Sequence, residues 1–241
     1  MSLVVALISV VLLNGYAATL ISLRSSVYRV PLYRPMLVNI GLSFAPVLFA
    51  FIGIAGLLLL APTLSVLTDE QPNVLVPVVL WTYMIVGTLV WLLFFPNSVY
   101  LITELNFSHR QAGTPVPLWY DIVQTLALTM SGIANAVLSL AVVQTGMIAI
   151  VLDANSAGTP PAGSWLFAGI ILLLGAVGVY LGRYLRFNSW DVKHPIVMVG
   201  KLRTHLTQRG KALEALAFVV THTVLIALVY VPLYAMAYAA L

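Results

Sequence analysis

Residues 36–61 read MLVNIGLSFAPVLFAFIGIAGLLLLA, and no charged side chain interrupts them. An α-helix rises 1.5 Å per residue, so about 20 mostly apolar residues cross the hydrocarbon core of a bilayer, which is about 30 Å thick. This stretch exceeds that minimum and is too apolar for the surface of a soluble protein. It therefore predicts a membrane-spanning helix.

Five other stretches have the length and composition of a span. The six predicted spans are residues 3–23, 36–61, 74–95, 118–152, 165–181 and 213–238. The 241-residue chain is 61% hydrophobic and only 7% charged, whereas a soluble domain has about 25% charged residues. We therefore predict an all-α fold, a polytopic transmembrane bundle of six helices, in one domain that comprises residues 1–241.

The eleven Lys and Arg residues fall only in alternate connections between these spans. They are Arg24, Arg29 and Arg34 after the first span, Arg110 after the third, and Arg183, Arg186, Lys193, Lys201, Arg203, Arg209 and Lys211 after the fifth. The other two connections, 62–73 and 153–164, contain acidic but no basic side chains. The positive-inside rule places basic loops in the cytoplasm, so both termini are predicted to lie outside.

Several classes of function are not supported by the sequence. There is no cysteine, which excludes disulfides, thiolate metal sites and thiol nucleophiles. Motifs typical of serine hydrolases, zinc proteases, P-loop NTPases and dinucleotide-binding domains are absent. His109, His194 and His205 lack the spacing of metal ligands, so no metal site is expected and no cofactor is identified. The basic residues are explained by membrane topology, so no nucleic-acid partner is expected.

Polar side chains gather in three segments on the predicted inner side. These segments are FPNSVYLITELN (95–106), PLWYD (117–121) and GRYLRFNSWDVKHP (182–195). Pro96 removes a helical hydrogen bond and is expected to stop or kink the third span, which leaves a short interfacial or re-entrant helix after it. The candidate site residues are Asn97, Tyr100, Glu104, Asp121, Arg183, Arg186, Asn188, Trp190 and Asp191.

Two interpretations of this inner-face group remain open. In the first, it is a site in which Arg183 and Arg186 hold a phosphate or carboxylate, because guanidinium groups bind such anions through two parallel hydrogen bonds. A carboxylate of Glu104, Asp121 or Asp191 then acts as acid, base or cation ligand, and the remaining candidates orient the ligand. In the second, the same carboxylates pair with the arginines and hold the helix ends together. Asp121 can equally be a carboxylate that starts a helix.

The motifs FFPNSVYLITEL (94–105), PLWYD and GRYLRFNSWDVKHP in a small six-span protein resemble a bacterial membrane family known as domain-of-unknown-function family 1361. The resemblance extends from about Val74 to Pro195. Family members typically read PNAPY before an acidic residue, whereas here Ser98 and Val99 replace the small pair and Glu104 stands where aspartate is usual. The resemblance implies the same fold and membrane location and points to the same residues, but it implies no reaction.

The fourth span has a polar stripe that includes Asp121, Gln124, Ser131, Asn135 and Ser139. Such a stripe either packs and hydrogen-bonds against other helices or lines a hydrated path. Asn135, Ser139 and His222 are the candidate intramembrane polar residues, and His222 is the one ionisable residue deep in a span. On the fifth span, Gly178 and Gly182 have the small-xxx-small spacing that permits close helix approach.

These observations predict a multi-pass protein of the bacterial cytoplasmic membrane. Its activity is undetermined, and whether it is an enzyme stays open. The first hypothesis is binding of a phosphate- or carboxylate-bearing lipid head group at the inner face. The second is a small-molecule transporter with a path along the fourth span. The third is a non-catalytic accessory subunit, with a membrane-protein partner or a second copy of the chain beside it in the lipid bilayer.

Overall fold

The computed structural model describes residues 3–67, 75–104, 115–152, 158–185 and 195–240. All regular structure within these residues is helical: α1 (Leu3–Tyr28), α2 (Arg34–Leu67), α3 (Leu75–Tyr100), the 3-10 helix η1 (Leu101–Glu104), α4 (Leu118–Ile150), α5 (Ala162–Tyr184), α6 (Pro195–Leu206) and α7 (Lys211–Ala239). Six of these helices, all except η1 and α6, are long and apolar enough to cross a membrane. The predicted all-α bundle of six spans is therefore confirmed.

Prolines and left-handed residues set several helix boundaries. Pro117 and Pro161 precede α4 and α5 in extended conformations, because proline has no N–H to offer the helix and its ring fixes φ. Gly210 has a φ of 81° before α7, a conformation that glycine adopts without steric cost. Arg29, which follows α1, has a φ of 52° and is in the left-handed conformation that commonly ends a helix.

The third span differs from its prediction at Pro96. The helix α3 continues through Pro96 to Tyr100, and only the single 3-10 turn η1 follows it. Pro96 packs against α5, where a Cβ added to Gly178 would lie 2.4 Å from the proline Cγ. This tertiary contact holds the chain helical past the position where one backbone hydrogen bond is lost. Asn97 and Tyr100 therefore belong to the last turn of a span.

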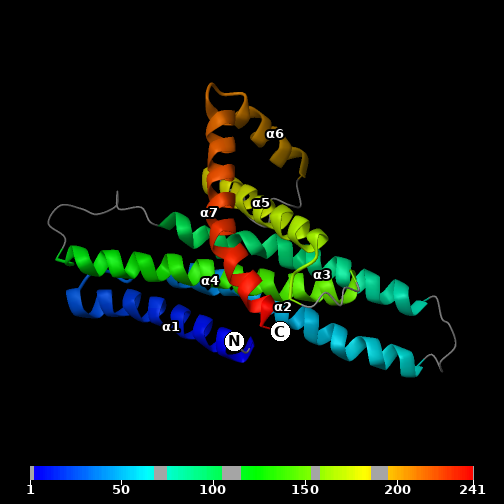
Figure 1. The fold of residues 1–241 in the computed structure, drawn as a ribbon. Coiled ribbons are helices and arrows are strands. Elements are labelled where there is room, and N and C mark those ends of the chain that lie inside the picture. The colour runs from blue at the N-terminus through cyan, green and yellow to red at the C-terminus, as the bar shows by residue number, and fades with distance from the viewer. Residues whose placement is uncertain (1–2, 68–74, 105–114, 153–157, 186–194, 241) are drawn as a thin grey trace.

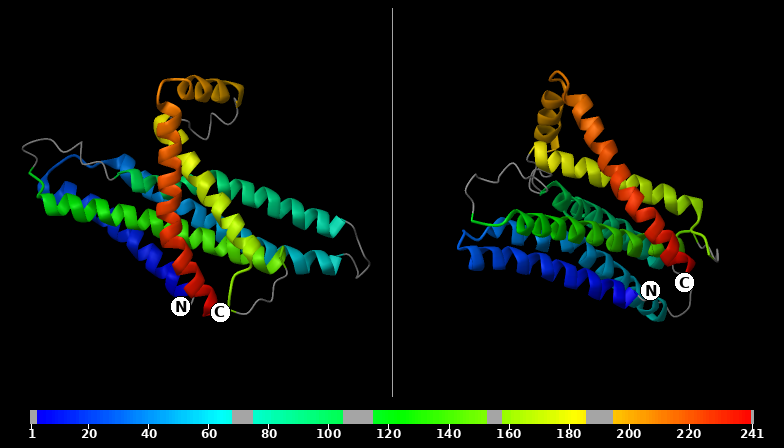
Figure 2. Two further views of the ribbon diagram at one scale, coloured as in Figure 1. Left: turned by 45° about the horizontal axis from the view of Figure 1, so that its top comes forward. Right: turned by 60° about the vertical axis from the view of Figure 1, so that its left-hand side comes forward.

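Four of the spans run roughly side by side, and the others cross them (Figure 1; Figure 2). The helices α1, α2, α3 and α4 form this layer, while α7 crosses it steeply and carries α6 beyond its start. The most buried span is α4, because it contacts α1, α2, α3, α5 and α7. The two termini lie close together in all views.

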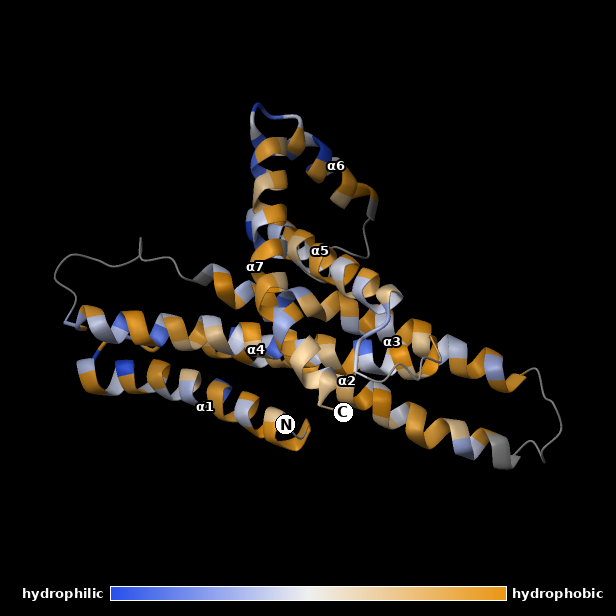
Figure 3. Ribbon diagram, viewed as in Figure 1, coloured by the Kyte–Doolittle hydropathy of each residue, from blue (hydrophilic) through white to orange (hydrophobic). Residues whose placement is uncertain are grey.

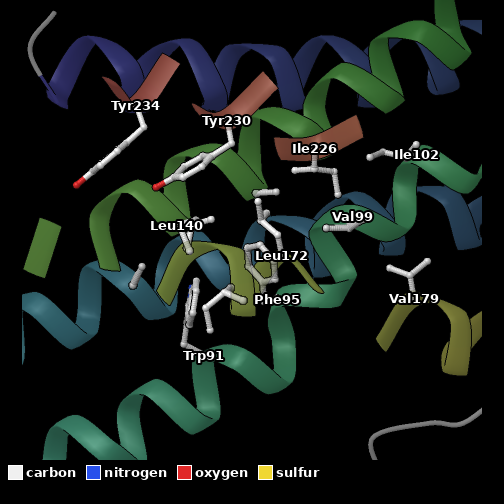
Figure 4. Packing of buried hydrophobic residues seen from close by; sticks show 14 of the residues in the cluster. Trp91, Phe95, Val99, Ile102, Leu140, Leu172, Val179, Ile226, Tyr230 and Tyr234 are labelled. Carbon is white, nitrogen blue, oxygen red and sulfur yellow. The ribbon is translucent and has the colours of Figure 1, made fainter. Parts of the chain in front are cut away.

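The largest apolar core joins α3, α4, α5 and α7 (Figure 4). Trp91 and Phe95 of α3 are almost fully buried and their rings lie 5.1 Å apart. Leu140 of α4, Leu172 of α5 and Tyr230 of α7 surround them. A second core packs the inner half of α1 against α4 and η1. Two cores of this kind fix the helix ends on which the candidate site residues lie.

The close approach of α3 and α5 depends on two glycines. A Cβ on Gly175 would lie 2.8 Å from the Phe95 ring, and a Cβ on Gly178 would meet Pro96. Gly182 has nothing within 4 Å of such a Cβ. The contact is therefore made by Gly175 and Gly178 rather than by the predicted pair Gly178 and Gly182.

Apolar residues predominate along the spans (Figure 3), and many of their side chains are exposed, as contact with lipid requires. Exposed leucines, valines and isoleucines cover α2, α3 and α7 in particular. With 34 residues, α2 is about 50 Å long at 1.5 Å per residue, which exceeds the core of a bilayer unless the helix tilts. The crossing of α7 over the α1–α4 layer likewise requires tilted helices.

Candidate functional site

The described structure separates the inner-face candidates into two groups. The first group is at the inner end of α5, where Arg183 Nη1 donates a hydrogen bond of 2.8 Å to Thr103 Oγ1 of η1. Thr103 Oγ1 in turn donates to the backbone carbonyl of Tyr100 at 2.6 Å. Threonine has both a donor and two acceptor lone pairs, so its hydroxyl accepts from Arg183 and donates to the end of α3 at the same time. The guanidinium group is thereby held at the junction of α3 and α5.

Within the described residues, Arg183 makes one side-chain hydrogen bond. A guanidinium group has five N–H donors, and one of them is used by Thr103. Among the described residues, no carboxylate forms an ion pair with Arg183. The side chain is half-buried, so its guanidinium group is only partly hydrated. A charge in this position attracts an anion more strongly than an arginine fully exposed to solvent.

Aromatic side chains surround the same end of α5. Tyr180, one turn before Arg183, is buried and its hydroxyl lies 2.8 Å from His205 Nε2 of α6. The Tyr180 and Tyr184 rings stack at 4.7 Å, and both rings lie within 5.6 Å of the Phe218 ring of α7. Aromatic residues are frequent at the membrane–water interface. We name Thr103, Tyr180, Arg183, Tyr184, His205 and Phe218 the α5 inner-end cluster.

The second group ties α1 to α4. Arg24 Nε lies 3.1 Å from Asp121 Oδ1, and the two side chains are 27% and 15% exposed. Beside this ion pair, the Tyr120 hydroxyl donates to the Leu20 carbonyl at 2.7 Å, and the Tyr28 and Tyr120 rings meet edge to face at 5.2 Å. Asp121 is therefore engaged by an arginine that the sequence left out of the candidate site.

The two groups lie at different levels along α4. The η1 turn starts against Gly132, where an added Cβ would lie 2.8 Å from Leu101 Cβ. At 1.5 Å per residue, Asp121 lies about 16 Å along α4 from Gly132. Asp121 and Arg183 therefore belong to two separate clusters.

The other inner-face candidates are placed only in part. Asn97 and Tyr100 are half-buried at the end of α3. The backbone of Glu104 ends η1, and its side chain lies outside the described residues. Arg186, Asn188, Trp190 and Asp191 fall in residues 186–194, which also lie outside the described part of the chain. Their predicted roles stay predictions.

The intramembrane candidates make contacts between helices or within one. Asn135 is fully buried and hydrogen-bonds to Asn14 of α1 and Ser43 of α2 at 2.8 Å each. Ser139, also buried, donates to the carbonyl of Ala136 in its own helix. His222 Nδ1 lies 2.9 Å from the carbonyl of Phe218, on whose ring the imidazole stacks at 3.8 Å. Asn135 therefore joins α4 to neighbouring helices, whereas the hydrogen bond of Ser139 stays within α4.

One polar cluster was not anticipated from the sequence. Tyr230 of α7 donates a hydrogen bond of 2.6 Å to Gln144 Oε1 of α4, and Gln144 Nε2 donates to Ser164 Oγ of α5 at 3.1 Å. Gln144, Tyr230 and Ser164 are all fully buried. One turn further along α7, the hydroxyls of Tyr234 and Thr145 lie 3.1 Å apart. The four-residue spacing of the tyrosines on α7 is visible in the sequence, but it does not indicate that Tyr230 bonds to a buried glutamine of α4.

Within the described residues, no three His, Cys, Asp or Glu side chains gather closely enough to hold a metal ion. The described residues of the α5 inner-end cluster supply a cation, hydrogen-bond donors and aromatic rings.

Comparison with known proteins gives a family and no activity. No curated protein and no solved structure matches the chain. A family model described as "Protein of unknown function (DUF1361)" matches residues 39–229. This range includes η1, the α5 inner-end cluster and most of α7. Since it covers far more than half of the chain, the protein belongs to the DUF1361 family.

Proposed function

We propose that this protein binds the phosphate or carboxylate group of a membrane lipid at the α5 inner-end cluster, in a cytoplasmic membrane where its basic loops face the cytoplasm. The observation that carries the proposal is the half-buried Arg183, which Thr103 orients and which no described carboxylate neutralises. Charge-assisted hydrogen bonds from arginine to phosphate or carboxylate are shorter and about twice as strong as neutral ones.

The position of the cluster suits a lipid better than a solute. Arg183 lies at the end of a span, where a head group sits, and exposed side chains such as Leu166 and Leu173 face outward on the same helix. The acyl chains of a lipid can stay in the bilayer beside that apolar surface. Binding then requires the protein to recognise only the head group, for which a guanidinium group, a histidine and two tyrosines are at hand.

The remaining polar clusters support structural roles. Asp121 is paired with Arg24, and Asn135 is enclosed between α1 and α2. These contacts use the side chains that a transport path along α4 or an acid–base site at Asp121 would need. Among the described residues, the α5 inner-end cluster places Arg183 beside a threonine, a histidine and aromatic rings.

The proposal is tested by thermal unfolding of the purified protein in detergent. Phosphatidic acid, phosphatidylglycerol and a fatty acid are compared with phosphatidylcholine, and inorganic phosphate and acetate are added separately. A ligand that binds only the folded state at 100 times its Kd stabilises it by about 2.7 kcal/mol. We expect an anionic lipid to raise the midpoint, whereas equal stabilisation by inorganic phosphate would identify a free anion as the ligand.

Two variants and one control separate binding from packing. Arg183→Gln should abolish the lipid-dependent rise, whereas Thr103→Val should weaken it because the guanidinium group keeps its charge but loses its orientation. Arg34→Gln, which removes an exposed arginine at the start of α2, is the matched control and should retain the rise. If Arg183→Gln lowers the midpoint and no lipid stabilises the wild type, Arg183 has a structural role.

A further inference from the structure

The helix α6 exposes two kinds of side chain, which are separated along its length. In the N-terminal half, Ile196, Val197 and Val199 are 87%, 57% and 60% exposed. In the C-terminal half the exposed side chains include Lys201 and Arg203. Such a run of bare β-branched residues is costly in water, at about 25 cal/mol per Å² of apolar area. Something other than water must cover it.

The opposite face of α6 is already occupied by the bundle. Met198, Leu202, His205 and Leu206 are partly buried, and α6 contacts α7. The Tyr180 hydroxyl of α5 lies 2.8 Å from His205 Nε2, and the two rings are 6.0 Å apart. These contacts determine which face of α6 turns outward. Ile196, Val197 and Val199 lie on that outward face and do not pack against the described helices.

Two predicted spans flank α6 in the chain. It lies in the chain between α5, which ends at Tyr184, and α7, which begins at Lys211. The 29 residues of α7 make a helix about 44 Å long, which exceeds a hydrocarbon core of about 30 Å unless the helix tilts. From the turn before α7, α6 runs away from α7 at an angle (Figure 1). The contact with α5 is made at its C-terminal end, where His205 Nε2 lies 2.8 Å from the Tyr180 hydroxyl, so the apolar N-terminal half extends away from this contact.

Cationic side chains follow the apolar half of α6 in the chain. Arg203 and Arg209 are exposed at and beyond the end of α6, and hydrophilic residues gather at the turn into α7 (Figure 3). A basic side chain near an anionic bilayer surface contributes about 1 kcal/mol of binding. A helix that exposes apolar residues in one half and cationic residues in the other complements an anionic phospholipid surface.

We infer that α6 is a membrane-surface helix whose Ile196, Val197 and Val199 insert at the acyl-chain boundary of the bilayer leaflet on the basic side, while Arg203 and Arg209 contact anionic head groups. The surface is distinct from the α5 inner-end cluster, because it binds the bilayer as a whole through the outward face of α6. The two share only the His205 contact, which positions α6 against α5.

Depth-dependent quenching in vesicles tests this inference. The chain has no cysteine, so Ile196→Cys, Val199→Cys and Gln208→Cys each introduce a single site for an environment-sensitive fluorophore. The full chain is reconstituted into phosphatidylcholine vesicles that contain phosphatidylglycerol. Quenching by lipids brominated on their acyl chains is compared with quenching by aqueous iodide. Gln208, exposed in the turn before α7, is the matched control position.

The labels at 196 and 199 should be quenched by brominated lipid and protected from iodide, and the label at 208 should show the reverse. Arg203→Gln with Arg209→Gln should lose part of the lipid quenching at 196, as should vesicles without phosphatidylglycerol. Iodide quenching at 196 equal to that at 208 overturns the inference. Protection at 196 from both quenchers also overturns it and assigns the surface to a protein. Arg183→Gln should leave the pattern unchanged, so failure here is distinguishable from failure of the lipid-site proposal.

Discussion

The side-chain amides of Asn14 in α1 and Asn135 in α4 donate hydrogen bonds to each other, at 2.8 and 3.0 Å. Each amide nitrogen also makes a second bond, from Asn14 to the carbonyl of Val10 and from Asn135 to the hydroxyl of Ser43, both at 2.8 Å. Ser98 of α3 donates to the carbonyl of Ser43 at 2.6 Å. Four spans are therefore joined through one buried polar cluster.

Replacing one amide should destabilise the bundle because its partner loses its hydrogen bond in an apolar surrounding. We expect Asn135→Leu and Asn14→Leu each to lower the free energy of unfolding by about 1–2 kcal/mol. The double variant should lose less than the sum, since neither amide is then left unpaired. Titration of the purified variants with a denaturing detergent measures this, and additive losses would show that the pair does not interact.

Tyr230 should contribute through its hydroxyl. Tyr230→Phe keeps the ring but leaves Gln144 Oε1 without its donor in a fully buried position, so we expect a loss of about 1–2 kcal/mol. Tyr16→Phe, at a half-exposed position on α1, is the control and should change nothing. Equal effects of the two substitutions on the unfolding midpoint would rule out the predicted role of the Gln144 cluster.

The contact between α3 and α5 predicts a difference between two glycines one turn apart. Gly178→Ala places a Cβ against the Pro96 ring, 2.4 Å from its Cγ, and should cost about 1–3 kcal/mol through overpacking. Gly182→Ala meets nothing within 4 Å and should be neutral or stabilising, because alanine favours helix. Comparison of the two midpoints checks this order, and the reverse order contradicts the observed packing.

Arg29 should tolerate glycine better than alanine. Its φ of 52° costs an L-residue about 1 kcal/mol that glycine avoids. Arg29→Gly and Arg29→Ala remove the same charge, so the difference between their unfolding midpoints isolates the backbone conformation. We expect Arg29→Gly to be the more stable of the two by about 1 kcal/mol. Equal stability would show that the left-handed conformation does not persist in the membrane.

The spans could be predicted because long uncharged stretches have few structural alternatives in a bilayer. The helix α6 could not, since its 12 residues are too few to span and its basic residues marked the region as a loop. Gln144 was missed because it lies about 180° around α4 from Asn135 at 100° per residue. The central helix is polar toward both neighbouring layers, and only the packing shows that both sides are buried.

The partner of Asp121 shows a different limit. Several arginines were predicted to lie at the same membrane face, and the choice of Arg24 depends on how α1 packs on α4 over a long sequence separation. Periodicity places a residue on one face of its own helix, but it does not select the helix opposite. The same limit applies to Thr103, whose hydrogen bond with Arg183 joins η1 to α5 across the fold.

Direct measurement of bound lipid tests the central proposal most closely. Native mass spectrometry counts the anionic phospholipid molecules that remain on the wild-type protein, on Arg183→Gln and on the Arg34→Gln control after release from mixed phosphatidylglycerol and phosphatidylcholine micelles. We expect the wild type and Arg34→Gln to retain an anionic lipid that Arg183→Gln has lost. Equal retention of lipid by all three proteins would contradict a lipid site at Arg183.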